Sequence, residues 1–296
     1  MGPLVTVKDG DRMGRLDGTR AVITGAASGI GEATARLFVA EGAAVVIADI
    51  DDHRGESIAS ELGERCRYVH ADVSQDGAVD AAVAVATSAV GGLDCLFNNA
   101  GNAGSTGEIE EIDMAVFDRT VAVHLRGVFL GIRAAARVMR PQGRGSIINT
   151  ASVAGLAANW AGHDYSACKA AIIQLTRTAA SELGEDGIRV NAICPGGIAT
   201  PIFGRAAGLD GEQAQRTTEF MTAALADLAP IRRAGQPSDI AEAALWLASD
   251  ASSYVNGQAI AVDGGVLTGP LHRQQKPGLL ALLDLLRQAP PPTPQP

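Results

Sequence analysis

Two side chains that could exchange a proton stand one helical turn apart near the middle of the chain. Tyr165 and Lys169 are separated by four residues in the segment YSACK, so on a helix the phenol and the ammonium point the same way. A nearby cation favours the phenolate and lowers the pKa of a tyrosine from its free value of about 10. Ser152 lies 13 residues before Tyr165, and a serine hydroxyl at the end of a preceding strand would hold an alcohol or carbonyl oxygen. The spacing predicts an acid–base site.

A glycine-rich turn, TGAASGIG, runs from Thr24 to Gly31 between a short apolar run and a helical pattern. Gly25 permits a tight turn, and Gly29 and Gly31 let the backbone approach a pyrophosphate, to which the following helix presents unpaired N–H groups. The spacing is GxxxGxG rather than GxGxxG, and a turn that only packs is the alternative. We expect the turn to bind a dinucleotide, which together with the acid–base site describes hydride transfer.

Asp49 is the candidate that selects the cofactor. It ends the second apolar run, 18 residues after Gly31, where a carboxylate would accept hydrogen bonds from the adenosine ribose hydroxyls and repel a 2′-phosphate. The glycine turn contains no Lys or Arg, so NAD is favoured over NADP. An Asp that only ends a strand or caps the next helix is the alternative for this residue.

Short apolar runs alternate with helix-length segments along the chain. The predicted strands are Ala21–Thr24, Val45–Asp49, Tyr68–His70, Leu93–Asn98, Ser146–Thr150, Arg189–Cys194 and Ala259–Val262. Runs that are apolar on both faces are typical of parallel strands covered by helices on each side. The pattern predicts a single-domain α/β fold of the Rossmann type, a doubly wound parallel sheet of about seven strands with helices on both faces.

We expect three parts along the chain and two long helices within it. Residues 1–15 form a flexible lead-in, 16–267 the dehydrogenase domain, and 268–296 an extension with a short apolar helix at 278–288 and a proline-rich end. The long helices are predicted at 113–139 and 165–183, each with one face on the sheet and another on a neighbouring subunit. A homodimer or homotetramer is therefore expected.

Composition excludes several classes of partner. The net charge is −9 with no cluster of Lys or Arg, so nucleic acid and anionic membranes are not expected partners. The four cysteines are scattered without a CxxC pair or a histidine cluster, which argues against a metal site and against a disulfide framework. Reduced thiols and the absence of a signal peptide favour the cytoplasm. The apolar segment at 278–288 is too short to span a membrane, which needs about 20 residues.

With these residues in hand, the chain resembles the short-chain dehydrogenase/reductase family from Leu16 to Gly265. Beyond TGAASGIG and YSACK, the match includes ADV at 71–73, NNAG at 98–101, SVAG at 152–155 and PGGIATP at 195–201. The segments HLRGVFLG and AARVM are most similar to those of the branch of xanthoxin, secoisolariciresinol and borneol dehydrogenases. The resemblance implies that ADV contacts adenine, NNAG steadies the central strand, and PGGIATP binds the nicotinamide amide. Lys169 would also hold the nicotinamide ribose. The cofactor-binding residues implied in this way, together with the turn, are Gly25, Ser28, Gly29, Ile30, Gly31, Asp49, Ile50, Asp72, Val73, Asn99, Ala100, Gly101, Tyr165, Lys169, Pro195, Gly196, Ile198 and Thr200.

One position departs from the family pattern. The long helix carries VHLRGVF, with His124 where family members have a catalytic Asn whose backbone carbonyl helps to hold a water beside the lysine. A histidine could join the proton relay, because its pKa lies near neutral. Alternatively, His124 is a tolerated replacement and only the backbone carbonyl acts.

The substrate is expected to be a small hydrophobic alcohol or ketone, cyclic or terpenoid. Val153, Trp160, His163 and the segment 200–228, which contains Ile202, Phe203, Phe220 and Met221, are expected to line the pocket beside Ser152. Trp160 and Phe203 could equally be core or subunit contacts. Two other functions remain open: an NADPH-dependent reductase of carbonyls or acyl-carrier thioesters, and a non-catalytic dinucleotide-binding sensor.

Overall fold

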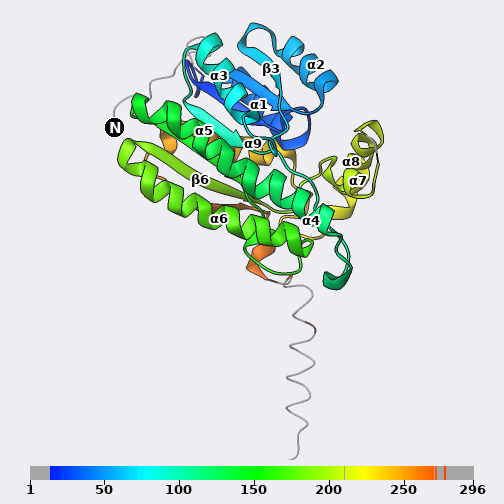
Figure 1. The fold of residues 1–296 in the computed structure, drawn as a ribbon. Helices are drawn as coiled ribbons and strands as arrows, with labels where there is room; N and C mark the ends of the chain where they lie inside the picture. The colour runs from blue at the N-terminus through cyan, green and yellow to red at the C-terminus, as the bar shows by residue number, and fades with distance from the viewer. Residues whose placement is uncertain (1–13, 210, 270, 272–276, 278–296) are drawn as a thin grey trace, which may run out of the picture.

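A computed structural model describes residues 14–209, 211–269, 271 and 277 (Figure 1). Nearly all of the predicted lead-in at 1–15 and most of the predicted extension at 268–296, including its apolar helix, lie outside these residues. Within them, no helix is both long and apolar enough to cross a bilayer.

The centre of the fold is a parallel sheet of seven strands in the order β3-β2-β1-β4-β5-β6-β7. The strands are β1 (Arg20–Thr24), β2 (Ala44–Asp49), β3 (Cys66–His70), β4 (Cys95–Asn98), β5 (Gly145–Thr150), β6 (Ile188–Pro195) and β7 (Ala259–Val262). The central β4 is buried along its whole length, whereas the edge strands β3 and β7 are partly exposed. This confirms the predicted fold class, because strands between two helical layers have no polar face.

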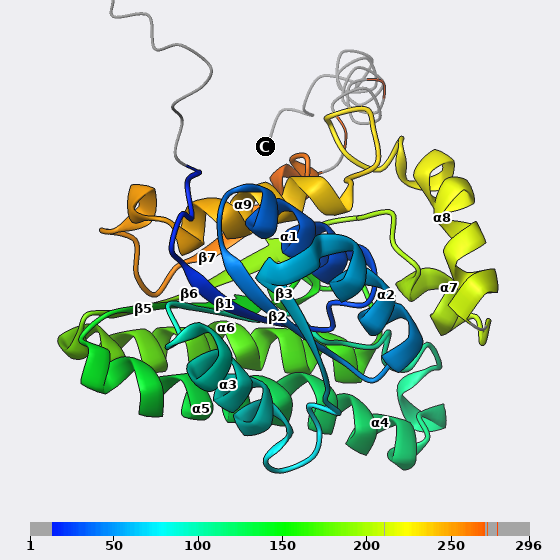
Figure 2. The same ribbon diagram turned by 90° about the horizontal axis from the view of Figure 1, so that it is seen from above.

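Helices cover both faces of the sheet. They are α1 (Gly29–Ala40), α2 (Asp52–Leu62), α3 (Ala78–Val90), α4 (Met114–Val121), α5 (Gly127–Gln142), α6 (His163–Leu183), α7 (Ile202–Ala206), α8 (Gly211–Leu225) and α9 (Pro237–Ala248). In Figure 2, α1, α2 and α9 lie on one face, and α3, α5 and α6 lie on the other. The short α7 and the longer α8 stand at the side of the molecule, in the connection between β6 and α9 (Figure 1).

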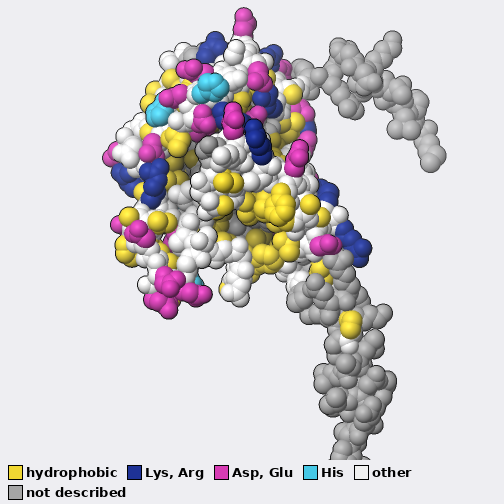
Figure 3. Space-filling view, turned by 90° about the vertical axis from the view of Figure 1, so that its right-hand side faces the viewer, with side chains coloured by type: hydrophobic (Ala, Val, Ile, Leu, Met, Phe, Trp, Pro, Cys, Tyr) yellow, Lys and Arg dark blue, Asp and Glu magenta, His cyan; other side chains and the backbone are white. Residues whose placement is uncertain are grey.

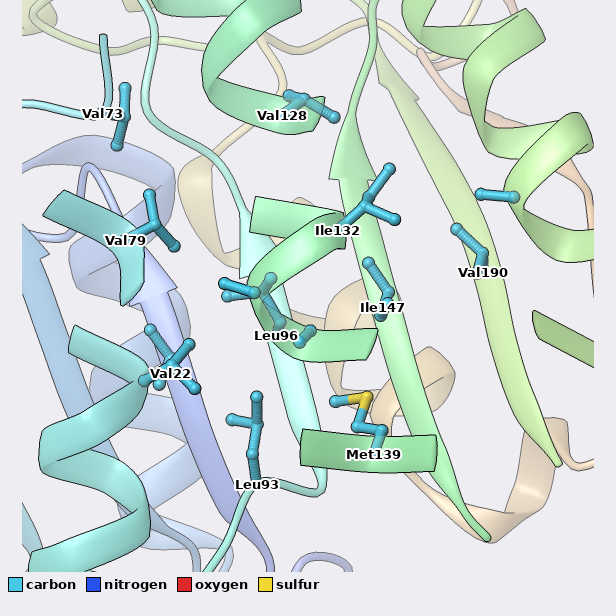
Figure 4. Close-up of a cluster of buried hydrophobic side chains, with 14 of the residues drawn as sticks. Val22, Val73, Val79, Leu93, Leu96, Val128, Ile132, Met139, Ile147 and Val190 are labelled. Atoms are coloured by element: carbon cyan, nitrogen blue, oxygen red, sulfur yellow. The ribbon is translucent and has the colours of Figure 1, made fainter. Parts of the chain in front are cut away.

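Each helical layer buries its own core against the sheet. Between α5 and the strands, Ile132 and Met139 pack with Val22, Leu96 and Ile147 (Figure 4). The opposite layer holds Phe38 of α1 and Phe97 of β4, both fully buried. These cores fix the sheet rigidly, so the loops that leave its carboxyl edge have a defined origin.

The long helix predicted at 113–139 is interrupted in the structure. Asp113 caps α4 by accepting a hydrogen bond from the Ala115 N–H at 2.8 Å. A π-helical turn, η3 (Ala122–Arg126), then separates α4 from α5. Single π turns inside α-helices are frequent at functional sites, and this one contains His124.

Candidate active site

Ser152, Tyr165 and Lys169 converge at the carboxyl edge of the sheet. Ser152 follows β5 and caps a short 3-10 turn, η4 (Val153–Gly155), by accepting a hydrogen bond from the Ala154 N–H at 3.1 Å. Tyr165 and Lys169 lie in the first two turns of α6. The Ser152 hydroxyl is hydrogen-bonded to the Tyr165 phenol, and the Lys169 Nζ lies 5.3 Å from the centroid of the tyrosine ring. The structure thus brings together the three predicted side chains.

Burial controls the protonation of both titratable groups. It raises the pKa of the Tyr165 phenol to about 12, and the hydrogen bond from Ser152 opposes this rise only in part. It lowers the pKa of Lys169 to about 7. The expected lowering of the phenol pKa by the lysine is therefore not found, because Lys169 is itself desolvated. Its Nζ donates instead to the Thr150 carbonyl at 2.7 Å.

His124 lies against the tyrosine on the other side. Its imidazole is 1% exposed and meets the Tyr165 ring edge-on, with centroids 5.1 Å apart. Its Nε2 lies 3.0 Å from the Asn102 carbonyl and 3.2 Å from the Asn102 N–H, while its Nδ1 has no partner among the described atoms. Burial, followed by the charge of Lys169, holds the pKa of His124 well below its usual value. The imidazole is therefore neutral near pH 7.

A buried aspartate that the sequence analysis did not single out holds the loop in front of the tyrosine. Asp164 is 1% exposed and accepts hydrogen bonds from the Ser105 N–H at 3.0 Å and the Ser105 hydroxyl at 2.7 Å. It also accepts one from the Tyr165 N–H at 2.8 Å. Burial acts to raise the pKa of Asp164, but the hydrogen bonds outweigh it and hold the pKa below its usual value. Asp164 therefore fixes the loop 101–106 to the start of α6 as a carboxylate.

The glycine turn is shaped by backbone contacts that only glycine permits. Gly25 has a φ of +65°, and a Cβ there would lie 2.6 Å from the Ala100 Cα. A Cβ at Gly31 would lie 2.2 Å from the Gly25 carbonyl oxygen. The Asn99 side-chain amide donates to the carbonyls of Thr24 and Gly25 at 3.0 and 3.1 Å. The NNAG segment therefore pins the turn to the end of β4.

Asp49 is positioned at the end of β2, beside the glycine turn. One carboxylate oxygen accepts from the Ala27 N–H at 2.8 Å and the other from the Ile50 N–H at 2.7 Å. The oxygen that faces Ile50 also accepts from the Asp51 N–H at 3.1 Å. The oxygen that faces Ala27 therefore retains acceptor capacity for a ribose hydroxyl, because a carboxylate oxygen can accept about two hydrogen bonds. Asp72, after β3, is turned toward Ser74, whose hydroxyl donates to it at 2.7 Å.

One cavity of about 850 Å³ connects these groups. The predicted residues that line it are Gly25, Ser28, Gly29, Ile30, Asp49, Ile50, Asp72, Val73, Asn99, Ala100, Gly101, His124, Ser152, Val153, Trp160, Tyr165, Lys169, Pro195, Gly196, Ile198, Thr200 and Phe203. Gly31 does not line the cavity, because it packs inward under the turn. The glycine cradle and the carboxylate of Asp49 fit the diphosphate and the adenosine ribose of a dinucleotide. Among the described residues, no cluster of three or more His, Cys, Asp and Glu side chains could hold a metal ion.

The end of the cavity beyond Ser152 is apolar and open. Trp160 and Phe203 are 42% and 37% exposed, and both line the cavity together with Ile202 and Leu228. Hydrophobic side chains gather in the middle of one face of the molecule (Figure 3). The expectation that His163, Phe220 and Met221 line the pocket is wrong, because none of them reaches the cavity. Phe220 points outward from α8 and is 73% exposed, and Met221 packs against Leu225 and its neighbours.

Comparisons with known proteins agree on one group of enzymes. The family described as Enoyl-(Acyl carrier protein) reductase matches residues 25–267. Momilactone A synthase from Oryza sativa subsp. japonica is 48% identical over 256 residues, which cover 85% of this chain and 91% of that protein. Mitochondrial borneol dehydrogenase from Lavandula x intermedia is 45% identical over 253 residues, which cover 85% and 92%. The crystal structure of levodione reductase has a TM-score of 0.76 and 36% identity, and the match covers 86% of this chain and 100% of that chain.

Proposed function

The chain belongs to the short-chain dehydrogenase/reductase family, whose members are oxidoreductases that use a nicotinamide dinucleotide, and from this premise we propose a more specific activity. The protein interconverts a hydrophobic, cyclic or terpenoid secondary alcohol and its ketone, with NAD(H) as cofactor. The observation that carries this proposal is the convergence of Ser152, Tyr165 and Lys169 on one cavity between the glycine turn and an apolar wall.

The proton transfer is assigned to the tyrosine. When bound, the nicotinamide ring supplies the hydride acceptor or donor. The Ser152 hydroxyl holds the substrate oxygen, and the Tyr165 phenol donates a proton to that oxygen in ketone reduction or accepts one in alcohol oxidation. Because burial raises the pKa of Tyr165 to about 12, the phenol is protonated at neutral pH in the ligand-free protein. Oxidation, which needs the phenolate, should therefore accelerate as the pH rises, whereas reduction should not.

The substrate class rests on the open end of the cavity. Its walls include the indole of Trp160 and the rings and aliphatic groups of Phe203, Ile202 and Leu228. Such walls favour a substrate with little polar surface. Borneol dehydrogenase and levodione reductase, both similar to this chain, are named for cyclic substrates. A cyclic alcohol or ketone is the class that these two observations favour together.

The experiment that tests the activity compares Tyr165→Phe with the parent protein. A panel of cyclic secondary alcohols and ketones is offered with NAD⁺ or NADH, and turnover is followed by the absorbance of NADH. The phenylalanine variant should bind NADH like the parent but lose nearly all turnover, since removal of a positioned acid–base group costs about 10²- to 10⁴-fold. Near-normal turnover by the variant would assign the proton transfer to another group.

The proposed preference for NAD(H) is supported by Asp49, whose carboxylate lies beside the glycine turn at the end of β2 and would repel a 2′-phosphate. We expect the parent to bind NADH much more tightly than NADPH. Replacing Asp49→Ser together with Ile50→Arg should narrow that difference, because the change removes the repelling charge and adds an attracting one. Equal affinities of the parent for the two cofactors, measured by fluorescence titration, would contradict the assignment.

We also propose that the protein works in the cytoplasm as a homodimer or homotetramer. The four cysteines are all free and buried, as suits a reducing compartment. The helical layer that contains α4 and α5 leaves Met114, Val116 and Phe129 between 40% and 61% exposed, which favours cover by a second subunit.

A further inference from the structure

One of the arginines that line the cavity reaches the glycine turn, although the proposed reaction does not use it. Arg205 lies in α7, at the side of the molecule where α7 and α8 stand (Figure 1), and its side chain is exposed at the cavity wall. Its guanidinium reaches across to the glycine turn, with one terminal nitrogen 3.4 Å from the Ser28 hydroxyl. The two residues are 177 positions apart in the sequence, so no local pattern indicates this approach.

Three other cations line the cavity, and two of them are engaged by other groups. Lys169 donates to the Thr150 carbonyl, and Arg233 forms an ion pair with Asp239 at 2.6 Å. Arg119 lies close enough to Asp72 to lower the pKa of that carboxyl group. In the described part of the chain neither Arg119 nor Arg205 forms an ion pair with a carboxylate, and of these two it is the Arg205 guanidinium that reaches the glycine turn. The Arg205 guanidinium is therefore the positive charge that an anion bound at the glycine turn would contact.

The other arginine at the turn, Arg54, is already bonded, because its Nε donates to the Ala27 carbonyl at 2.7 Å. Glu32 in the first turn of α1 is neutralised by Arg36 and Arg54, each at 3.0 Å. The start of α7 is held close to the turn, because a Cβ at Gly29 would lie 3.3 Å from the Thr200 side chain and 3.7 Å from Pro201. A diphosphate on the N–H groups of the turn would thus lie within reach of the Arg205 guanidinium.

We infer that Arg205 binds the diphosphate of the cofactor and thereby holds α7 against the glycine turn. The inference rests on the proposed function, since it takes a dinucleotide as the ligand. A guanidinium matches two phosphate oxygens and makes charge-assisted hydrogen bonds to them. Occupation of the cofactor site would then order the segment that forms one wall of the substrate pocket. Arg205 is a binding and positioning residue in this scheme and takes no part in proton transfer.

The test measures binding without turnover. Dissociation constants for NADH, NADPH, ADP-ribose and adenosine are determined for the parent and for Arg205→Met, Arg205→Lys and Arg216→Met. Arg216, an exposed arginine on α8 that does not line the cavity, is the matched control. Arg205→Met should weaken NADH and ADP-ribose by about tenfold, the value of one charge-assisted contact at an exposed site. The affinity for adenosine, which has no phosphate, should not change. Arg205→Lys should lose less affinity for NADH than Arg205→Met, and the affinities of Arg216→Met should equal those of the parent.

Other results would distinguish an error in the role of Arg205 from an error in the proposed function. Affinities of Arg205→Met within about twofold of the parent for both NADH and ADP-ribose would overturn the inference. A loss confined to NADPH would place the arginine at a 2′-phosphate and would also overturn it. A parent that binds neither dinucleotide would overturn the proposed function together with the inference. As a second readout, ADP-ribose should slow amide hydrogen exchange over 202–225 in the parent and less so in Arg205→Met.

Discussion

At the scale of single residues, His124 and Lys169 are two of the buried polar groups beside Tyr165. His124 supports the loop at Asn102 through Nε2 and packs edge-on against Tyr165. We expect His124→Ala to lower turnover by about ten- to hundredfold, because the loop and the phenol lose their positions. The pH profile should not move, because the histidine is already neutral. His124→Asn should retain more activity than the alanine variant.

The control for this prediction is His163→Ala, which changes a histidine that lies outside the cavity. Its rate and pH profile should match those of the parent. A pH profile displaced by His124→Ala, but not by His163→Ala, would show that the imidazole of His124 takes part in the proton relay.

Lys169 should lower the free energy of unfolding of the protein at low pH. Its pKa is about 7 in the folded protein against an ordinary value of 10.5, so below pH 7 a charge must be buried. As the pH rises from 7 to 10.5, the folded protein releases that proton while the unfolded chain still holds it, and the relative stability of the folded state increases. Lys169→Met should therefore stabilise the protein by about 1–4 kcal/mol near pH 6, with a difference that shrinks toward about pH 10. Denaturant unfolding at several pH values measures this, and a difference that grew with pH would contradict it.

Most of the candidate site could be predicted from single residues because its motifs are local. Tyr165 and Lys169 share one helix, and Gly25 and Gly29 share one turn, so their spacing already indicates their arrangement. Asp164 and Arg205 were missed because their partners, Ser105 and Ser28, are 59 and 177 positions away. The raised pKa of the Tyr165 phenol was missed for a related reason. Sequence spacing indicates which charged groups are near one another, but the burial of these groups in the fold decides how far their pKa values shift.

At the scale of elements, the predicted strands were found with shifted ends. The strand that was expected to start at Leu93 begins at Cys95. The side-chain amide of Gln142 on α5 accepts a hydrogen bond from the Leu93 N–H and donates one to the Leu93 carbonyl, so neither group is free to pair with a neighbouring strand. The π turn at His124 was not predicted either, since the whole segment 113–139 was expected to form one regular helix. Both departures depend on contacts between elements and have no local sequence signal.

The glycine turn provides a prediction at this scale. Gly25→Ala should lower the free energy of unfolding by about 2–4 kcal/mol and weaken NADH binding, because a Cβ at positive φ would also push Ala100 away. Gly77→Ala is the matched control. Its φ is +82°, but no atom lies near the added Cβ, so it should cost only the backbone strain of about 1–2 kcal/mol. Equal effects of the two variants on NADH binding would refute the packing argument.

At the scale of the whole molecule, the carboxyl ends of the parallel strands lie at one edge of the sheet, and this explains how residues from 25 to 266 share one cavity. The predicted resemblance to the borneol dehydrogenase branch is confirmed by the 45% identity with borneol dehydrogenase. The subunit arrangement was expected from the apolar character of the long helices. Two exposed phenylalanines, Phe129 on α5 and Phe220 on α8, allow that expectation to be examined with matched substitutions.

Phe129 is 52% exposed on the helical layer that we propose as a subunit contact. Burial of a phenylalanine stabilises an interface by about 1.5–3 kcal/mol, and a glutamate there would have to lose its hydration without a partner. Phe129→Glu should therefore shift the protein toward smaller assemblies in analytical ultracentrifugation. Phe220→Glu makes the same change at a side chain that is 73% exposed on α8, outside that layer, and should leave the mass unchanged. A parent that sediments as a monomer, or a Phe129→Glu variant with the parent's mass across a dilution series, would show that this helical face is not the contact between subunits.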